Sequence, residues 1–181
     1  LGYPILADPL SQLRCGDHDQ SMVISSYDAF LRMDSFIESA QPDLVLRFGA
    51  MPTSKPVLLY LKRYAPCPLA VIDGYGGWEE PTQLASALIH ADLTAFCQGL
   101  INILEGSDGN GEKQPFASQA WTTMWRDADR VTRQTIQAAI QDFNEFFEGR
   151  VFTELANLVV DGTTLYAGNS MPVRDLDTFF W

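Results

Sequence analysis

The segment 49–56, which reads Gly-Ala-Met-Pro-Thr-Ser-Lys-Pro, places a lysine at the start of an expected helix. Its spacing approaches that of a phosphate-binding loop, but Ser54 stands where the second glycine belongs and Pro56 replaces the magnesium-binding hydroxyl. Proline also lacks the backbone N–H that would face a phosphate. Two interpretations stay open. One is an ordinary strand-to-helix turn capped by Thr53 or Ser54, and the other is a helix N-terminus whose Lys55 binds a carboxylate.

A second segment, residues 168–175, reads Gly-Asn-Ser-Met-Pro-Val-Arg-Asp and also opens an expected helix. Asn169 and Ser170 offer side-chain hydrogen bonds, and Arg174 adds a planar guanidinium four residues after the serine. With free backbone N–H groups at a helix start, these are the features of an anion site. The alternative is an ordinary serine cap. In that alternative Arg174 pairs with one of two aspartates, Asp175 or Asp177.

The remaining reactive residue types form no recognisable catalytic set. A glycine-rich stretch at 73–77 has the wrong spacing for a dinucleotide site and is better explained as a tight loop. His18 and His90 lie far apart, without partners for a metal site or a triad. The cysteines are widely spaced, which indicates reduced thiols rather than a disulfide framework. We expect no catalytic residue and no metal ligands in this chain.

Alternating strands and helices would position these segments. Short apolar runs predict strands at 4–7, 43–48, 69–72, 87–90 and 163–167. Apolar residues three or four positions apart predict helical segments at 24–39, 55–64, 93–104, 118–147 and 151–159. Because strands joined by helices run parallel, we expect an α/β fold with a three-layer, Rossmann-like arrangement. It would have one parallel sheet of about five or six strands, with helices on both faces. Gly49, Asp73 and Gly168 would end strands at the edge where such sheets bind ligands.

Length and charge narrow the classes of protein. The chain has 181 residues, 46% of them hydrophobic, which suits one large domain. Its net charge of −11 argues against nucleic-acid binding. The densest basic group, Arg126, Arg130 and Arg133, is interrupted by Asp127 and Asp129. No apolar run reaches the roughly 18 residues that a membrane span needs.

Taken together, residues 4–11 (Pro-Ile-Leu-Ala-Asp-Pro-Leu-Ser), 47–56 and 168–175 resemble a known family. It is the 2-succinyl-5-enolpyruvyl-6-hydroxy-3-cyclohexene-1-carboxylate (SEPHCHC) synthase family of menaquinone and phylloquinone biosynthesis. The resemblance implies a transferase that uses thiamine diphosphate with magnesium or manganese. It decarboxylates 2-oxoglutarate and adds the four-carbon unit to isochorismate. Members have three α/β domains, of which the outer two bind the cofactor.

The resemblance also implies a division of the chain and roles for its residues. Residues 1–168 would be the central domain, and 169–181 the lead-in to the diphosphate-binding domain. Ser170 and Arg174 would face substrate carboxylates, Asn169 would shape the turn, and Lys55 would reach the same cleft. The chain lacks the family's Gly-Asp-Gly motif with its downstream asparagine pair. We therefore expect thiamine diphosphate and Mg²⁺ to be bound by other domains, none by this chain, and the isolated chain to be inactive.

Further expectations concern the whole protein. The sequence begins Leu-Gly-Tyr-Pro, and we expect a piece of a longer cytoplasmic polypeptide without a signal peptide. The full enzyme would be a homodimer or a homotetramer. Two other functions stay open: a nucleotide-binding domain, and a structural spacer, each within another thiamine-diphosphate enzyme.

Overall fold

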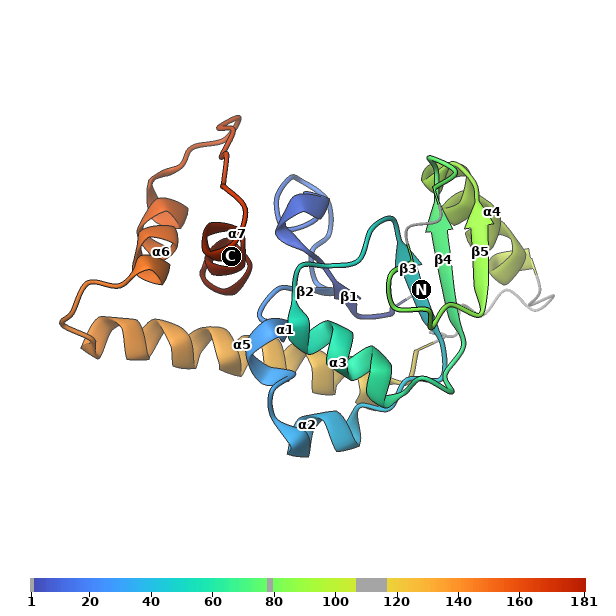
Figure 1. Cartoon of the computed structure of the whole chain (residues 1–181), viewed down its shortest axis with the longest axis horizontal. Coiled ribbons are helices and arrows are strands. Elements are labelled where there is room, and N and C mark those ends of the chain that lie inside the picture. The colour runs from blue at the N-terminus through green and yellow to red at the C-terminus, as the bar shows by residue number, and fades with distance from the viewer. Residues whose placement is uncertain (1, 78–79, 107–116) are drawn as a thin grey trace.

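The computed structural model describes residues 2–77, 80–106 and 117–181. Two parallel sheets with helices around them form an α/β fold (Figure 1), which confirms the expected class. The smaller sheet pairs β1 (Ile5–Leu6) with β2 (Val23–Ile24). The larger sheet has the order β3 (Val45–Phe48), β4 (Leu69–Asp73) and β5 (Ala87–His90). The strands of both sheets run parallel, with Val45 beside Leu69 and Ala70 beside Ala87.

Seven helices and one short 3-10 helix accompany these strands within the described residues. They are η1 (Pro9–Ser11), α1 (Tyr27–Phe30), α2 (Asp34–Ser39), α3 (Lys55–Arg63), α4 (Leu93–Gly106), α5 (Gln119–Asp142), α6 (Glu148–Leu158) and α7 (Met171–Phe179). In Figure 1, α5 runs beneath α1 and toward α6, while the larger sheet and α4 lie at the opposite end. Among the residues that the structure describes, no helix has both the length and the hydropathy to cross a membrane.

The expected helix at 24–39 is wrong. Ile24 belongs to β2, and two short helices, α1 and α2, follow it. The backbone N–H groups of Ser25 and Ser26 donate to the Asp129 carboxylate at 2.8 and 2.7 Å, so they serve a tertiary contact rather than a helix. At the end of α1, the Arg32 side chain donates to the Asp28 carbonyl at 3.0 Å. In a continuous helix the backbone N–H of Arg32 would donate to this carbonyl, but here the Arg32 side chain does so.

The expectation of a single sheet is also wrong, and so is the strand at 163–167. The described strands form two sheets, and residues 163–168 have no regular structure. Residues 161–166 are exposed, and the Thr163 N–H donates to the nearby Val160 carbonyl at 3.1 Å. An apolar run without a neighbouring strand to supply backbone partners does not form a sheet. Gly168 consequently precedes α7 without ending a strand.

The core lies where α1, α2 and α3 meet α5. Trp125 of α5 is 2% exposed and makes edge-to-face contacts with Phe30, Phe36 and Tyr60. The Tyr60 hydroxyl donates to the Ala40 carbonyl at 2.5 Å, and burial raises the pKa of Tyr60. Aromatic pairs in this geometry stabilise by about 0.5–1.5 kcal/mol beyond their buried area. This core fixes the first turns of α1 and α3.

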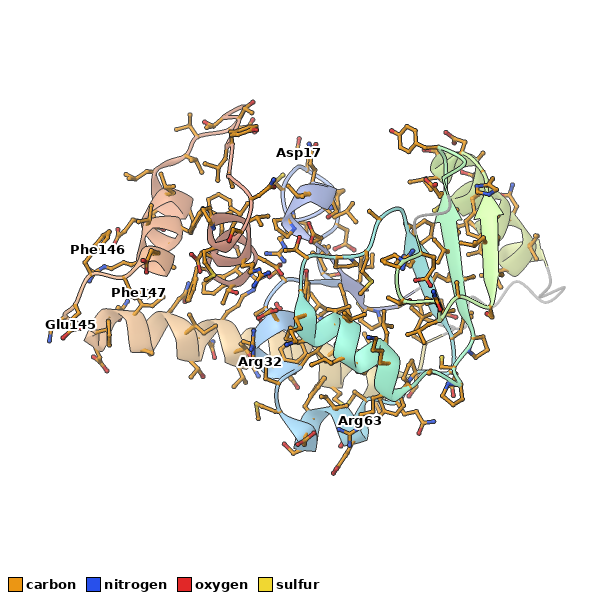
Figure 2. The ribbon with its side chains drawn as sticks, in the orientation of Figure 1. Asp17, Arg32, Arg63, Glu145, Phe146 and Phe147 are labelled. Atoms are coloured by element: carbon orange, nitrogen blue, oxygen red, sulfur yellow. The ribbon has the colours of Figure 1, made fainter. Side chains whose placement is uncertain are left out.

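Gly149 lets α6 pack closely against α7. Phe147, labelled in Figure 2 with its neighbour Phe146, stacks edge-to-face on Phe179 with ring centroids 5.6 Å apart. A Cβ on Gly149 would overlap the Phe179 ring and lie 2.7 Å from a ring carbon of Phe147. We expect Gly149→Ala to lower the free energy of unfolding by about 1–3 kcal/mol, as overpacking does.

Gly99 offers a matched control for this change, because it lies within α4 and a Cβ there would meet nothing within 4 Å. Gly99→Ala is expected to raise the free energy of unfolding by up to about 1 kcal/mol, the difference in helix propensity. Urea denaturation of both variants is the measurement. Equal effects of the two substitutions would contradict tight packing at Gly149.

Candidate functional site

The segment 168–175 places its candidate residues at the N-terminus of α7. Asn169, Ser170 and Arg174 are all exposed. Ser170 precedes the helix with φ 73°, a conformation uncommon for a residue other than glycine, and its side chain accepts no capping hydrogen bond. The geometry of Ser170 therefore differs from that of an ordinary serine cap, and the anion site stays a prediction.

Arg174 does not pair with the aspartates of its own helix. Asp175 is buried, and its pKa is raised by burial and by the nearby Glu148. Asp177 pairs with Arg14 instead. Within residues 2–77, 80–106 and 117–181, no carboxylate forms an ion pair with Arg174. The alternative in which Arg174 pairs with either aspartate is therefore wrong.

A buried group of polar side chains binds the last turn of α7. Arg14 forms an ion pair with Asp177, and their side chains are 7% and 3% exposed. Arg14 also donates to the Asp177 carbonyl at 2.9 Å, and the Tyr27 hydroxyl donates to the Asp177 carboxylate at 3.0 Å. Burial raises the pKa of Asp177 to about 6 although Arg14 opposes the rise. Burial and the neighbouring Asp177 likewise raise the pKa of Tyr27. These bonds fix the direction in which α7 points.

Lys55 is the first residue of α3 and is exposed. Ser54 caps this helix, as expected, by accepting the Val57 N–H at 3.4 Å. The turn starts at Gly49, whose φ of 72° favours glycine. Next to it, the Arg47 side chain donates to the Gly49 carbonyl at 3.2 Å and to Glu80 at 3.0 Å. The turn is thus held at both ends and presents Lys55 outward.

Glu80 holds this turn as a charged group. Burial raises its pKa, but hydrogen bonds from Thr82, Arg47 and the Leu84 N–H outweigh burial and lower the pKa to about 2. Glu80 is therefore ionised at neutral pH beside the buried Arg47.

The structure groups three of the four predicted residues and places the fourth on another helix. Asn169, Ser170 and Arg174 share the start of α7, whereas Lys55 starts α3. Both helices contact α1, but no hydrogen bond or ion pair joins Lys55 to α7 within the described residues. Sequence reasoning did not predict the contacts that connect the two helices, and it considered Asp177 only as a partner of Arg174. The residues that make these contacts are Asp8, Arg14, Tyr27, Asp28 and Asp177. Asp8 appeared only within a motif, and Arg14 carried no local signal.

Two other features of the surface do not form a comparable site. The Asp73 carboxylate accepts the N–H groups of Tyr75 and Gly77 at 3.1 Å each. It therefore orders its own loop. No group of three or more His, Cys, Asp or Glu that could bind a metal occurs in the described part of the chain.

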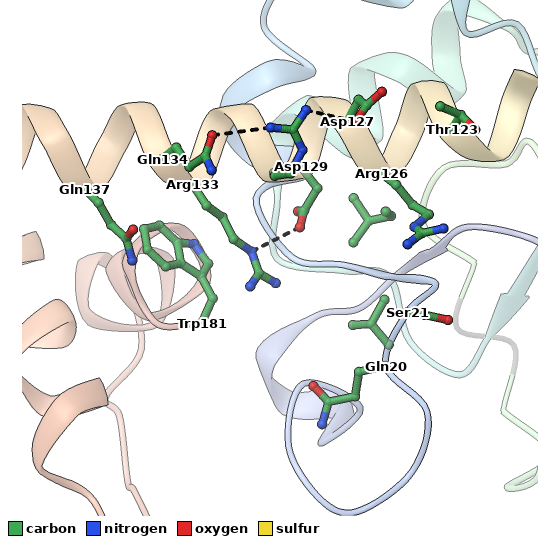
Figure 3. A pocket seen from close by; sticks show the side chains of 13 residues that line it. Gln20, Ser21, Thr123, Arg126, Asp127, Asp129, Arg133, Gln134, Gln137 and Trp181 are labelled. Atoms are coloured by element: carbon green, nitrogen blue, oxygen red, sulfur yellow. Dashed lines mark hydrogen bonds and ion pairs between the residues drawn. The ribbon is translucent and has the colours of Figure 1, made fainter.

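An open cavity of about 630 Å³ is lined by α5, by residues of the segment 20–24 and by Trp181 (Figure 3). Arg133 lies 3.0 Å from Asp129 and 5.9 Å from the ring centre of Trp181, while Arg130 lies 3.0 Å from Asp127. These two arginines are thus partly neutralised by aspartates of the same helix. This agrees with the expectation that α5 forms no concentrated basic patch.

The described residues form an α/β domain in which exposed cations, Lys55 and Arg174, lie in the first turns of α3 and α7. Over all 181 residues, the chain is 46% identical to the 2-succinyl-5-enolpyruvyl-6-hydroxy-3-cyclohexene-1-carboxylate synthase of Geobacillus thermodenitrificans. It is 45% identical over 179 residues to the synthase of that name from Chloroflexus aurantiacus. The chain spans 29% and 30% of these two relatives. No protein-family model matches it.

These relatives confirm the resemblance drawn from the three motifs. Three further synthases of that name are at least 34% identical to the chain over at least 180 residues, among them those of Geobacillus kaustophilus and Bacillus cytotoxicus. The chain is therefore a homologue of part of the SEPHCHC synthases.

Proposed function

We propose that the chain forms the central α/β part of a SEPHCHC synthase. This transferase decarboxylates 2-oxoglutarate and adds the resulting unit to isochorismate in the cytoplasm. Residues 1–168 form the central domain in this proposal, and 169–181 lead into the next. The observation that carries it is Arg174 at the start of α7, which pairs with no carboxylate of the described residues, in a chain homologous over its whole length to these synthases.

The chemistry of both substrates fits the residues at the two helix starts. 2-Oxoglutarate and isochorismate each carry two carboxylates, and a guanidinium binds a carboxylate through two parallel hydrogen bonds. Arg174 and the Ser170 hydroxyl supply such donors at one helix N-terminus, where the helix dipole adds to the attraction. Lys55 supplies a second cation at the start of α3. We assign these residues to substrate binding, and Asn169 to the turn that leads into α7.

Thiamine diphosphate supplies the chemistry for breaking and forming the carbon–carbon bonds beside the carbonyl group. The described residues do not fit a site for its metal-bound diphosphate, because they contain no cluster of metal ligands. We therefore place thiamine diphosphate and Mg²⁺ on other parts of the synthase. The role of this chain is to bind and orient the carboxylates of the substrates.

Lys55→Ala in the synthase is the test of this proposal in the central domain. We expect kcat/KM for one carboxylate substrate to fall about tenfold or more, because one ion pair with the substrate is lost. The free energy of unfolding should change by no more than about 0.5 kcal/mol, since Lys55 is exposed. Steady-state kinetics and urea denaturation measure the two quantities.

Lys62→Ala is the matched control, because Lys62 is an exposed lysine in the last turn of the same helix. It should leave kcat/KM unchanged for both substrates. A large loss of stability in Lys55→Ala with unchanged kinetics would assign Lys55 a structural role instead. Equal kinetic losses in both variants would point to overall charge rather than to a site.

A further inference from the structure

The turn before Lys55 is ordered by a carboxylate from the N-terminal segment. One oxygen of Asp8, Oδ2, accepts the Thr53 N–H at 2.9 Å. The other, Oδ1, accepts the Leu10 N–H at 2.9 Å and so caps η1. A single half-buried side chain therefore fixes its own segment and the turn at Thr53, which lies 45 residues from Asp8 in the sequence. Thr53 is two residues from Lys55, so this bond helps to determine where α3 begins.

The same N-terminal segment also fixes α7. Six residues after Asp8, the Arg14 side chain donates to the Ala7 carbonyl at 2.7 Å. It reaches the Asp177 carboxylate and, at 3.4 Å, the Phe180 carbonyl beyond the end of α7. Residues 7–14 thus contact the turn before Lys55 at one end and the helix of Arg174 at the other.

A second connection runs parallel to this one through the first turn of α1. Tyr27 donates to Asp177 at 3.0 Å, and its neighbour Asp28 accepts the Ser54 hydroxyl at 2.6 Å. Tyr27 is fully buried, while Asp28 and Ser54 are 9% and 4% exposed. Two adjacent residues of α1 therefore bind α7 and the cap of α3. Both segments reach α7 at Asp177, in its last turn, so buried polar contacts from two separate segments connect the end of α7 to the start of α3.

We propose that Asp8 is a positioning residue that places Lys55 relative to α7. This rests on the proposed function, in which Lys55 and Arg174 bind substrate carboxylates. Asp8 acts through the Thr53 N–H and touches no substrate. Loss of this bond leaves the Ser54–Asp28 contact to hold the turn, so α3 still forms while Lys55 loses its fixed place. Small displacements of a binding group cost about 10- to 100-fold in rate.

The test is a double-mutant cycle in the synthase between Asp8→Asn and Lys55→Ala. Asparagine caps helices as well as aspartate does, but its amide group offers one acceptor oxygen where the carboxylate offers two. We expect Asp8→Asn to lower kcat/KM about tenfold for the same substrate that Lys55→Ala affects, mainly through KM. In the Lys55→Ala background, Asp8→Asn should have no further effect, because groups that act through one another are not additive. A general loss of structure would instead lower kcat/KM in both backgrounds.

Asp92→Asn is the matched control. Asp92 accepts the Ala95 N–H at 2.8 Å in the first turn of α4 and is exposed, so this variant should keep wild-type kinetics. Where Asp8→Asn yields too little folded protein, Asp8→Ser keeps a capping oxygen and should show the same non-additivity.

Three outcomes overturn the inference, and they are distinguishable. In the first, Lys55→Ala lowers kcat/KM and Asp8→Asn lowers it by the same factor in the wild-type and Lys55→Ala backgrounds. This removes the positioning role of Asp8 while the proposed function stands. A kinetically silent Asp8→Asn does the same. A kinetically silent Lys55→Ala removes both the role of Lys55 and that of Asp8.

Discussion

Arg174→Ala is expected to lower kcat/KM of the synthase about 30- to 5,000-fold for the substrate whose carboxylate it binds. This corresponds to roughly 2–5 kcal/mol of transition-state binding, the usual cost of removing one partner of a desolvated charge pair. Arg174 follows Ser170 by four residues and forms no ion pair with a carboxylate in the part of the chain that the structure describes. Its guanidinium is therefore available to a ligand. Steady-state kinetics with 2-oxoglutarate and with isochorismate identify which substrate it binds.

Two further variants make this expectation specific. Arg174→Lys should recover only part of the loss, because an ammonium group cannot form two parallel hydrogen bonds to one carboxylate. Arg130→Ala removes an exposed arginine that pairs with Asp127 on α5, and it should leave both kinetic constants unchanged. Near-wild-type kcat/KM in Arg174→Ala would remove Arg174 from the site. A comparable loss in Arg130→Ala would show an effect of net charge instead.

The local sequence predicted the larger sheet well because its strands are short, largely apolar runs, two of which are bounded by proline and glycine. The runs at 43–48, 69–72 and 87–90 became β3, β4 and β5, in parallel as expected. Each strand finds its partner next along the chain, so local patterns are sufficient. The run at 163–167 contains two threonines and a tyrosine and has no neighbouring strand among the described residues, and it is irregular.

The break between β2, α1 and α2 was not predictable from periodicity. Residues 24–39 have helical spacing, but Asp129 lies more than 100 residues away and binds the N–H groups of Ser25 and Ser26. That contact depends on where α5 packs. Tertiary hydrogen bonds of this kind override local propensity.

The outward-facing part of the site was predictable and its support was not. Lys55, Ser170 and Arg174 stand at helix starts whose capping and proline signals are local. Arg14 and Asp177 are separated by 163 residues, and nothing in either neighbourhood indicates that the two side chains meet. A single charged residue in a loop is ordinarily exposed. Burial of this pair is a property of the fold.

Arg14→Ala is expected to lower the free energy of unfolding by about 3–5 kcal/mol at pH 8, because it leaves the buried Asp177 carboxylate without its cation. The loss should be smaller at pH 5. Burial raises the pKa of Asp177 from 3.8 to about 6, so the folded state binds this proton more tightly than the unfolded state. The free energy of unfolding of the wild-type protein therefore falls as the pH rises from the unfolded pKa of 3.8 through the folded pKa of about 6. Without Arg14 the pKa rises further, and the fall continues to higher pH.

Urea denaturation at pH 5 and pH 8 measures both losses, and Asp177→Asn provides the control. In the Asp177→Asn background the titrating carboxyl is gone, while the Arg14 bonds to the carbonyls of Ala7 and Asp177 involve the backbone and can persist. Arg14→Ala should then cost the same free energy at both pH values. An equal cost at pH 5 and pH 8 in the Arg14→Ala single variant would show that Arg14 stabilises α7 through those carbonyl bonds rather than by compensating the charge of Asp177.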